Sequence, residues 1–168
     1  MKGASLVLAL LTTALLTATS ALAGIDLNLT GGIDVSGSFD LGEISSSADP
    51  GFTLGLELMF EVPVVELGVG FEYGFGRDTG ISGAEAEYWN LYGVGRLFVF
   101  GRFYLVARVG YYDLSTDQVL EGEVGNDMTI GGGAGLGILK NLKVEILFND
   151  LTDSLDYEAW LARAVFTF

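Results

Sequence analysis

Apolar side chains recur at every second residue of this chain, in eight separate stretches. In the stretch 52–62, for example, they alternate with Thr53, Glu57 and Glu61. A period of two places one set of side chains on each face of a β-strand, whereas a helix would scatter the same residues around its axis. The remaining stretches are about 25–39, 65–75, 87–99, 103–112, 128–138, 142–149 and 160–168. The chain is therefore expected to be all-β.

The connections between these stretches alternate in length. Those near 63, 101 and 140 are short, and the others are long, at about 40–51, 76–87, 113–127 and 149–157. An antiparallel barrel is threaded in this way when one rim carries turns and the other carries loops. The pattern predicts an eight-stranded, antiparallel, up-and-down barrel.

The apolar face could be the core of a soluble β-sandwich or lipocalin-like barrel, or the lipid-facing surface of a membrane barrel. Two features favour the membrane. The opposite face carries charged residues and many glycines, and the aromatic residues of the apolar face gather at the strand ends around an aliphatic middle. Amphipathic rings settle at headgroup depth, and a closed barrel leaves no unpaired strand edge in lipid. The expected girdles are Phe39, Phe52, Tyr73, Phe75, Trp89, Tyr111, Phe148 and Trp160 near the loops, and Phe60, Phe103, Phe166 and Phe168 near the turns.

The first segment has the order of a secretory signal peptide. Lys2 supplies a basic start, an apolar run follows from Leu6 to Leu16, and small residues at Ala21 and Ala23 form an A-x-A cleavage site. The apolar run is shorter than the roughly 20 residues that a spanning helix needs. Residues 1–23 are therefore expected to be removed, leaving a barrel domain over 24–168.

The sequence resembles the small outer-membrane β-barrel family of OmpX-, OmpA- and opacity-type proteins. The resemblance rests on the predicted signal peptide, the alternating strands, the Lys140-Asn141 hairpin and the terminal Phe168. The C-terminal run with Trp160, Phe166 and Phe168 resembles the signal by which the barrel assembly machinery recognises such chains. The resemblance implies a monomer in the outer membrane of a Gram-negative bacterium. It predicts a fold more than a function, because these barrels serve several purposes.

Catalytic chemistry finds little support in the composition. The chain has no His and no Cys, which removes imidazole bases, disulfides and Cys/His zinc sites. The Gly-x-Ser-x-Gly motif and the nucleotide-binding glycine motifs are also absent. No catalytic, cofactor or metal site is expected. A lipid-modifying enzyme, the least favoured alternative, would need a base that the sequence does not supply.

Charged residues on the face opposite the apolar one are expected to fill the interior. An eight-stranded barrel is only wide enough for its side chains to fill it. The favoured interpretation is a closed ion-pair network, and the alternative is a small-solute or ion channel through rearranged pairs. Glu61 is also expected inside. The network proper is predicted to comprise Glu57, Glu66, Glu72, Arg96, Arg108, Lys143, Glu145 and Arg163.

Negative charge is concentrated in the four long connections. Of the 22 acidic residues, 15 lie in 40–51, 76–87, 113–127 and 149–158, where Arg77 is the only base. The formal net charge of −14 argues against nucleic acid as a partner. Acidic loops either keep the protein solvated or bind a basic partner or divalent cations that bridge to lipopolysaccharide phosphates. A structural or surface-interaction role, in adhesion or envelope stability, is therefore expected.

Overall fold

All strands in the computed structural model belong to one antiparallel sheet, within the residues that the structure describes: 25–41, 44–78, 85–116, 126–151 and 156–168. No cis peptide bond occurs in these ranges. The strands are β1 (Ile25–Leu41), β2 (Ile44–Ala48), β3 (Gly51–Val62), β4 (Val65–Asp78), β5 (Glu85–Phe100), β6 (Phe103–Thr116), β7 (Asn126–Leu139), β8 (Leu142–Leu151) and β9 (Asp156–Thr167).

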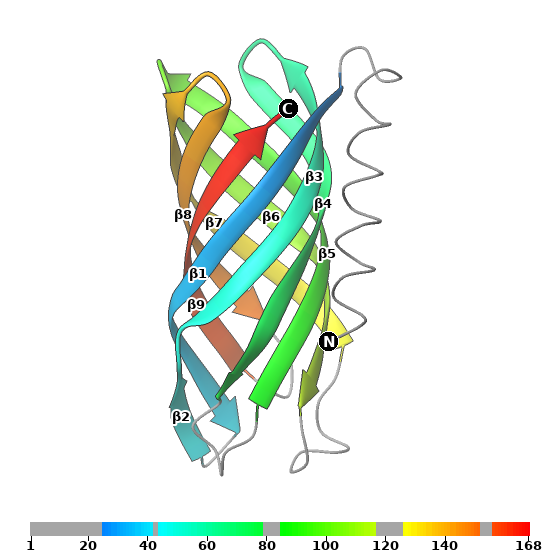
Figure 1. Cartoon of the computed structure of the whole chain (residues 1–168), viewed down its shortest axis with the longest axis vertical. Coiled ribbons are helices and arrows are strands. Elements are labelled where there is room, and N and C mark those ends of the chain that lie inside the picture. Colours follow the sequence, from blue (N-terminus) through cyan, green and yellow to red (C-terminus); the bar gives the residue numbers. More distant parts are fainter. Residues whose placement is uncertain (1–24, 42–43, 79–84, 117–125, 152–155) are drawn as a thin grey trace.

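The sheet closes on itself because β1 pairs with β9 as well as with β3 (Figure 1). The short strand β2 pairs with β1 over Gly37–Leu41, and β3 pairs with β1 over Ile25–Asp34, so both occupy the same place beside β1. The wall is thus an eight-stranded antiparallel barrel, as the sequence predicts. The hairpin turns at 63–64, 101–102 and 140–141 lie at one end, here called the turn rim, and the opposite end is the loop rim.

The strands extend further toward the loop rim than the sequence pattern predicts. The expected loop 40–51 contains β2, and strands β4 to β9 reach into the other regions assigned to loops. Near the loop rim the outward residues are no longer apolar, so the alternation of apolar and polar residues ends there. Backbone pairing continues beyond that point, because the ladder needs only N–H and C=O groups.

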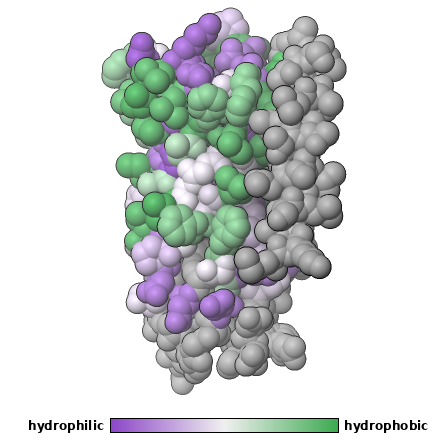
Figure 2. Space-filling model, in the orientation of Figure 1, coloured by the Kyte–Doolittle hydropathy of each residue, from purple (hydrophilic) through white to green (hydrophobic). Residues whose placement is uncertain are grey.

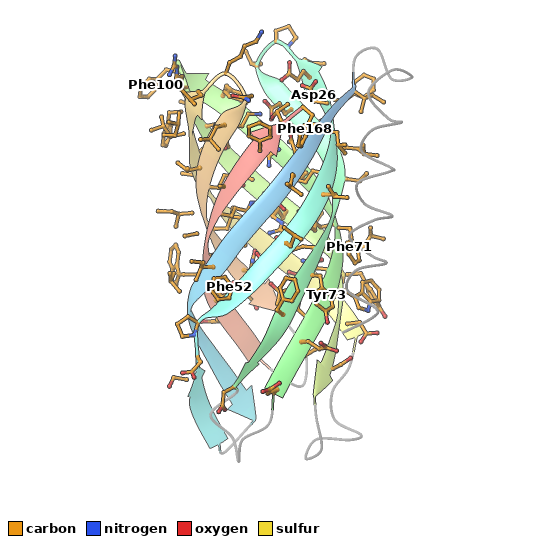
Figure 3. All side chains as sticks on the ribbon, in the orientation of Figure 1. Asp26, Phe52, Phe71, Tyr73, Phe100 and Phe168 are labelled. Carbon is orange, nitrogen blue, oxygen red and sulfur yellow. The ribbon has the colours of Figure 1, made fainter. Side chains whose placement is uncertain are left out.

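The two faces of the barrel are divided as expected. Over the middle of the wall, the outward side chains from β3 to β9 are mostly apolar and exposed, while the inward side chains, charged ones included, are buried. Figure 2 shows this apolar surface between hydrophilic residues at the two ends of the visible face. Phe52 and Tyr73 lie in the loop-side half, and Phe100 and Phe168 lie near the turn rim (Figure 3). Phe39, which the sequence places in the loop-side girdle, has its side chain outside the described residues.

Inward glycines allow tyrosine rings to lie against the barrel wall. Gly70 pairs with Tyr92 across β4 and β5, and a Cβ at Gly70 would lie 2.5 Å from the Tyr92 ring. Gly135 and Tyr104 have the same relation across β7 and β6. Gly131 makes room in the same way for the Asn149 side chain of the neighbouring strand β8.

The predicted signal peptide, with Ala21 and Ala23, lies outside the described residues. Within the described ranges, no helix is long and apolar enough to cross a membrane.

Candidate functional site

Inward charged side chains from six strands meet in the barrel interior. Strand β3 contributes Glu57, β4 Glu66 and Glu72, β5 Arg96, β6 Arg108, β8 Lys143 and Glu145, and β9 Arg163. All eight residues are buried. The structure therefore brings together the eight residues of the predicted network, whereas Glu61, which was also expected inside, is exposed.

A compact cluster of two guanidinium groups and two carboxylates occupies the centre, and is here called the four-residue cluster. Arg96 bonds Glu57 at 2.6 Å through Nη2 and Glu145 at 2.6 Å through Nε. Arg163 bonds the same two carboxylates, at 2.9 Å to Glu57 and 2.5 Å to Glu145. None of the four side chains is accessible to solvent. Two positive and two negative charges cancel, so the cluster is neutral and each charge faces two opposite ones.

Two tyrosines add hydrogen bonds to this cluster. The Tyr92 hydroxyl donates to Glu57 Oε1 at 3.1 Å, and the Tyr104 hydroxyl donates to Glu145 Oε1 at 2.9 Å. Sequence reasoning did not assign Tyr92 or Tyr104 to the network. Their inward parity and their pairing with glycines were the signals that could have done so.

A second group of charges lies between the four-residue cluster and the turn rim. Lys143 Nζ is 2.5 Å from Glu66 Oε1, and Arg96 Nη1 is 3.6 Å from Glu66 Oε2. The Lys143 ammonium also lies 5.8 Å from the centre of the Phe98 ring. Glu61 does not join this group. Its side chain is exposed at the turn rim, because β3 ends one residue later and the barrel no longer encloses it.

On the loop side of the four-residue cluster the interior is polar but less completely paired. Arg108 Nη2 lies 3.3 Å from Glu72 Oε1, and the guanidinium carbon lies 3.6 Å from the centre of the Tyr92 ring. The three Arg108 nitrogens, Glu72 Oε2 and Asn90 Oδ1 are nevertheless buried without a hydrogen-bond partner. Buried polar atoms of this kind are normally satisfied by water. The loop-side half of the interior therefore has the chemistry of a hydrated space.

The interior offers strong electrostatic pairing and little chemical reactivity. Carboxylates held between two guanidinium groups are poor proton acceptors, since accepting a proton would break charge-assisted hydrogen bonds. Among the described residues, no group of three or more acidic side chains is placed to hold a metal ion.

The three residues of the predicted assembly signal lie on the outer face of β9 or just beyond it. Trp160, Phe166 and Phe168 are all exposed, and the Phe166 and Phe168 rings make an edge contact with centres 4.9 Å apart.

No protein-family model matches the sequence, and no curated protein matches it. Solved structures do resemble the fold. Ail, the attachment invasion locus protein of Yersinia pestis, superposes with a TM-score of 0.61 at 13% identity, over 88% of this chain and 100% of that one. Neisserial surface protein A gives 0.59 at 13% identity, over 87% and 98%. The N-terminal barrel domain of Pseudomonas aeruginosa OprF gives 0.52 at 12% identity, over 85% and 97%. The predicted resemblance to small eight-stranded outer-membrane barrels is thus confirmed for the fold.

Proposed function

We propose that this chain is an integral outer-membrane barrel of a Gram-negative bacterium, with an interior closed by ion pairs and with acidic loops that interact at the cell surface. The observation that carries the proposal is the four-residue cluster of Arg96, Arg163, Glu57 and Glu145. It joins strands β3, β5, β8 and β9 across the interior through bonds of 2.5–2.9 Å. Fully buried and mutually paired side chains at this level support a closed interior.

The membrane location is supported by the outer surface. Large apolar side chains are exposed all around the wall, and water would be a poor solvent for a surface of this kind. Aromatic pairs lie toward both rims, such as Phe148–Trp160 on the loop side and Phe100–Phe103 on the turn side. Rings at these two levels suit the two headgroup regions of a bilayer. We take the barrel to be a monomer, inserted with the help of the barrel assembly machinery.

The surface role is inferred from the charge of the loop rim. The four long connections hold most of the acidic residues of the chain. A structure of Ail contains the heparin analogue sucrose octasulfate. An acidic rim would repel such a polyanion, so we expect this chain to bind basic partners, or divalent cations that bridge to lipopolysaccharide phosphates. This role is structural or adhesive, and no catalytic step is assigned to it.

The experiment compares acids at the two rims. In intact cells producing the barrel, polylysine binding is measured for Asp117→Asn/Glu121→Gln and, as the matched control, Asp26→Asn/Glu61→Gln at the turn rim. Loss of binding with the loop variant alone supports the proposal. Equal binding by both variants and the unaltered chain would reject the surface role.

A channel remains the second candidate, because Arg108, Glu72 and Asn90 have buried polar atoms without a hydrogen-bond partner on the loop side. Water there would form a vestibule that ends at the four-residue cluster. Ion conduction would require that cluster to rearrange. Bilayer conductance that changes with Arg96→Gln would favour this candidate.

A further inference from the structure

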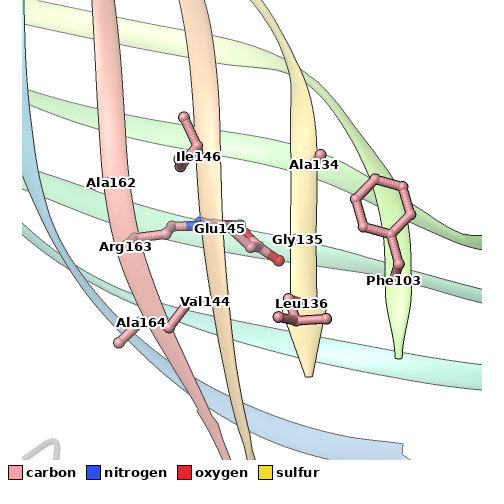
Figure 4. A pocket seen from close by; sticks show the side chains of 10 residues that line it. All are labelled: Phe103, Ala134, Gly135, Leu136, Val144, Glu145, Ile146, Ala162, Arg163 and Ala164. Atoms are coloured by element: carbon pink, nitrogen blue, oxygen red, sulfur yellow. Dashed lines mark hydrogen bonds and ion pairs between the residues drawn. The ribbon is translucent and has the colours of Figure 1, made fainter. Parts of the chain in front are cut away.

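The outer surface of the described wall has a groove in its turn-side half. A groove of about 540 Å³ crosses strands β6 to β9, and Phe103 and Ile146 are among the larger side chains that line it (Figure 4). Ala134 and Ala162 flank Ile146 in the pairing of β7, β8 and β9, and Ala164 follows on β9. The small side chains leave a depression among larger apolar neighbours. The groove is therefore apolar and open to the surroundings of the barrel.

Two exposed cations lie at the turn rim beside this groove. Arg102 is in the turn that leads into β6, directly before Phe103, and Lys140 is in the turn between β7 and β8. Arg102 Nη1 donates a hydrogen bond to the carbonyl oxygen of Ile138 at 2.9 Å, which holds the guanidinium against the end of β7. Both cations thus lie in turns that adjoin strands of the groove.

The rest of the turn rim has the opposite charge. Asp26 on β1 and Glu61 on β3 supply carboxylates on the part of the rim away from β6 to β8. The third cation near this end, Lys143, is buried and paired with Glu66. Unpaired positive charge at the described turn rim is therefore concentrated at the end of the groove.

We propose that this surface, here called the lipid site, binds an anionic phospholipid of the leaflet that meets the turns. Its phosphate would contact Arg102 and Lys140, and one acyl chain would lie in the groove against Phe103 and the alanines. Basic residues next to a membrane attract anionic headgroups, and an apolar groove gains dispersion contacts with a chain that fills it. The inference rests on the membrane location proposed above.

The test measures phospholipid retained by the folded, full-length barrel after extraction from vesicles of phosphatidylglycerol and phosphatidylcholine, by native mass spectrometry. Arg102→Gln and Lys140→Gln should each lower phosphatidylglycerol retention by about fivefold, the effect of one basic residue at a membrane surface. Arg77→Gln is the matched control, because it removes the same charge at the loop end of β4, and it should retain phosphatidylglycerol normally. Equal retention by all three variants would overturn the proposal.

The groove has its own pair of variants, which covers the case in which a rim variant does not fold. Ala164→Phe fills the groove, and Ala107→Phe adds the same ring elsewhere on the outer face. Only Ala164→Phe should lose the lipid, whereas normal retention by it would reject the groove as the seat of the acyl chain. Displacement of the lipid by inorganic phosphate alone would also reject an acyl-chain site in the groove, since such displacement would indicate a site for phosphate only. A barrel that does not insert into the vesicles contradicts the membrane location, whereas one that inserts but retains no phosphatidylglycerol contradicts this inference alone.

Discussion

Removing Arg163 should destabilise the barrel more than removing any exposed charge. The side chain is fully buried, and it bonds Glu57 at 2.9 Å and Glu145 at 2.5 Å. In Arg163→Met the four-residue cluster keeps both carboxylates but only the Arg96 guanidinium, so its charge changes from zero to −1. An uncompensated buried charge left by breaking such a pair costs about 3–5 kcal/mol. The free energy of unfolding should fall by that amount.

The assay is urea unfolding of the barrel in lipid vesicles, followed by the fluorescence of Trp89 and Trp160. Lys140→Met, at an exposed residue in the turn between β7 and β8, is the control, and a surface substitution of this kind should change the free energy of unfolding by no more than about 0.5 kcal/mol. The double variant Arg163→Met/Glu145→Met restores a neutral cluster, so it should recover most of the loss. Arg163→Met with the same free energy of unfolding as the control would refute this reasoning. So would a double variant that is less stable than Arg163→Met by the whole free energy that Glu145→Met costs alone.

Four further predictions concern the wall, the assembly and the topology. Leu56→Arg should lower the free energy of unfolding by about 2–4 kcal/mol in vesicles, because the guanidinium would meet lipid, and a neutral result would mean that the facing is inverted. Gly135→Val should cost about 1–3 kcal/mol in the same assay, since the added side chain overlaps the Tyr104 ring, and unchanged stability would contradict that contact. Deleting Phe168 should leave misfolded chain in the periplasm, so normal outer-membrane levels would count against its role as a signal. Protease added to intact cells should cut within 117–125 and spare 139–142, and the reverse would place the turns outside.

Much of the fold could be predicted because a barrel wall repeats one simple rule. Each inward or outward assignment follows from a period of two, so placing Arg96 inside also places Leu97 outside. The ends of the strands could not be predicted as well. Beyond the apolar belt the outer face is polar, so the alternation does not mark β2 or the loop-side ends of β4 to β7 as strand.

Which charged residues face the interior could be predicted more easily than which of them pair with one another. Parity alone selects inward charges, but pairing depends on the shear of the barrel, which brings together residues far apart in the chain. Glu57 and Arg163 are 106 residues apart in sequence and bond at 2.9 Å. Glu61 shows the limit of parity, because its alternation matches that of Glu57 but it lies where the wall ends.

The central claim, a membrane barrel whose interior is closed by paired charges, is tested most directly by planar-bilayer conductance. The protein is first shown to be folded by the heat-dependent shift of its band on a gel. A closed interior should leave the bilayer silent when the unaltered barrel is added. Steady, ion-selective current steps would contradict it and would make Arg96, Arg163, Glu57 and Glu145 the filter of a channel.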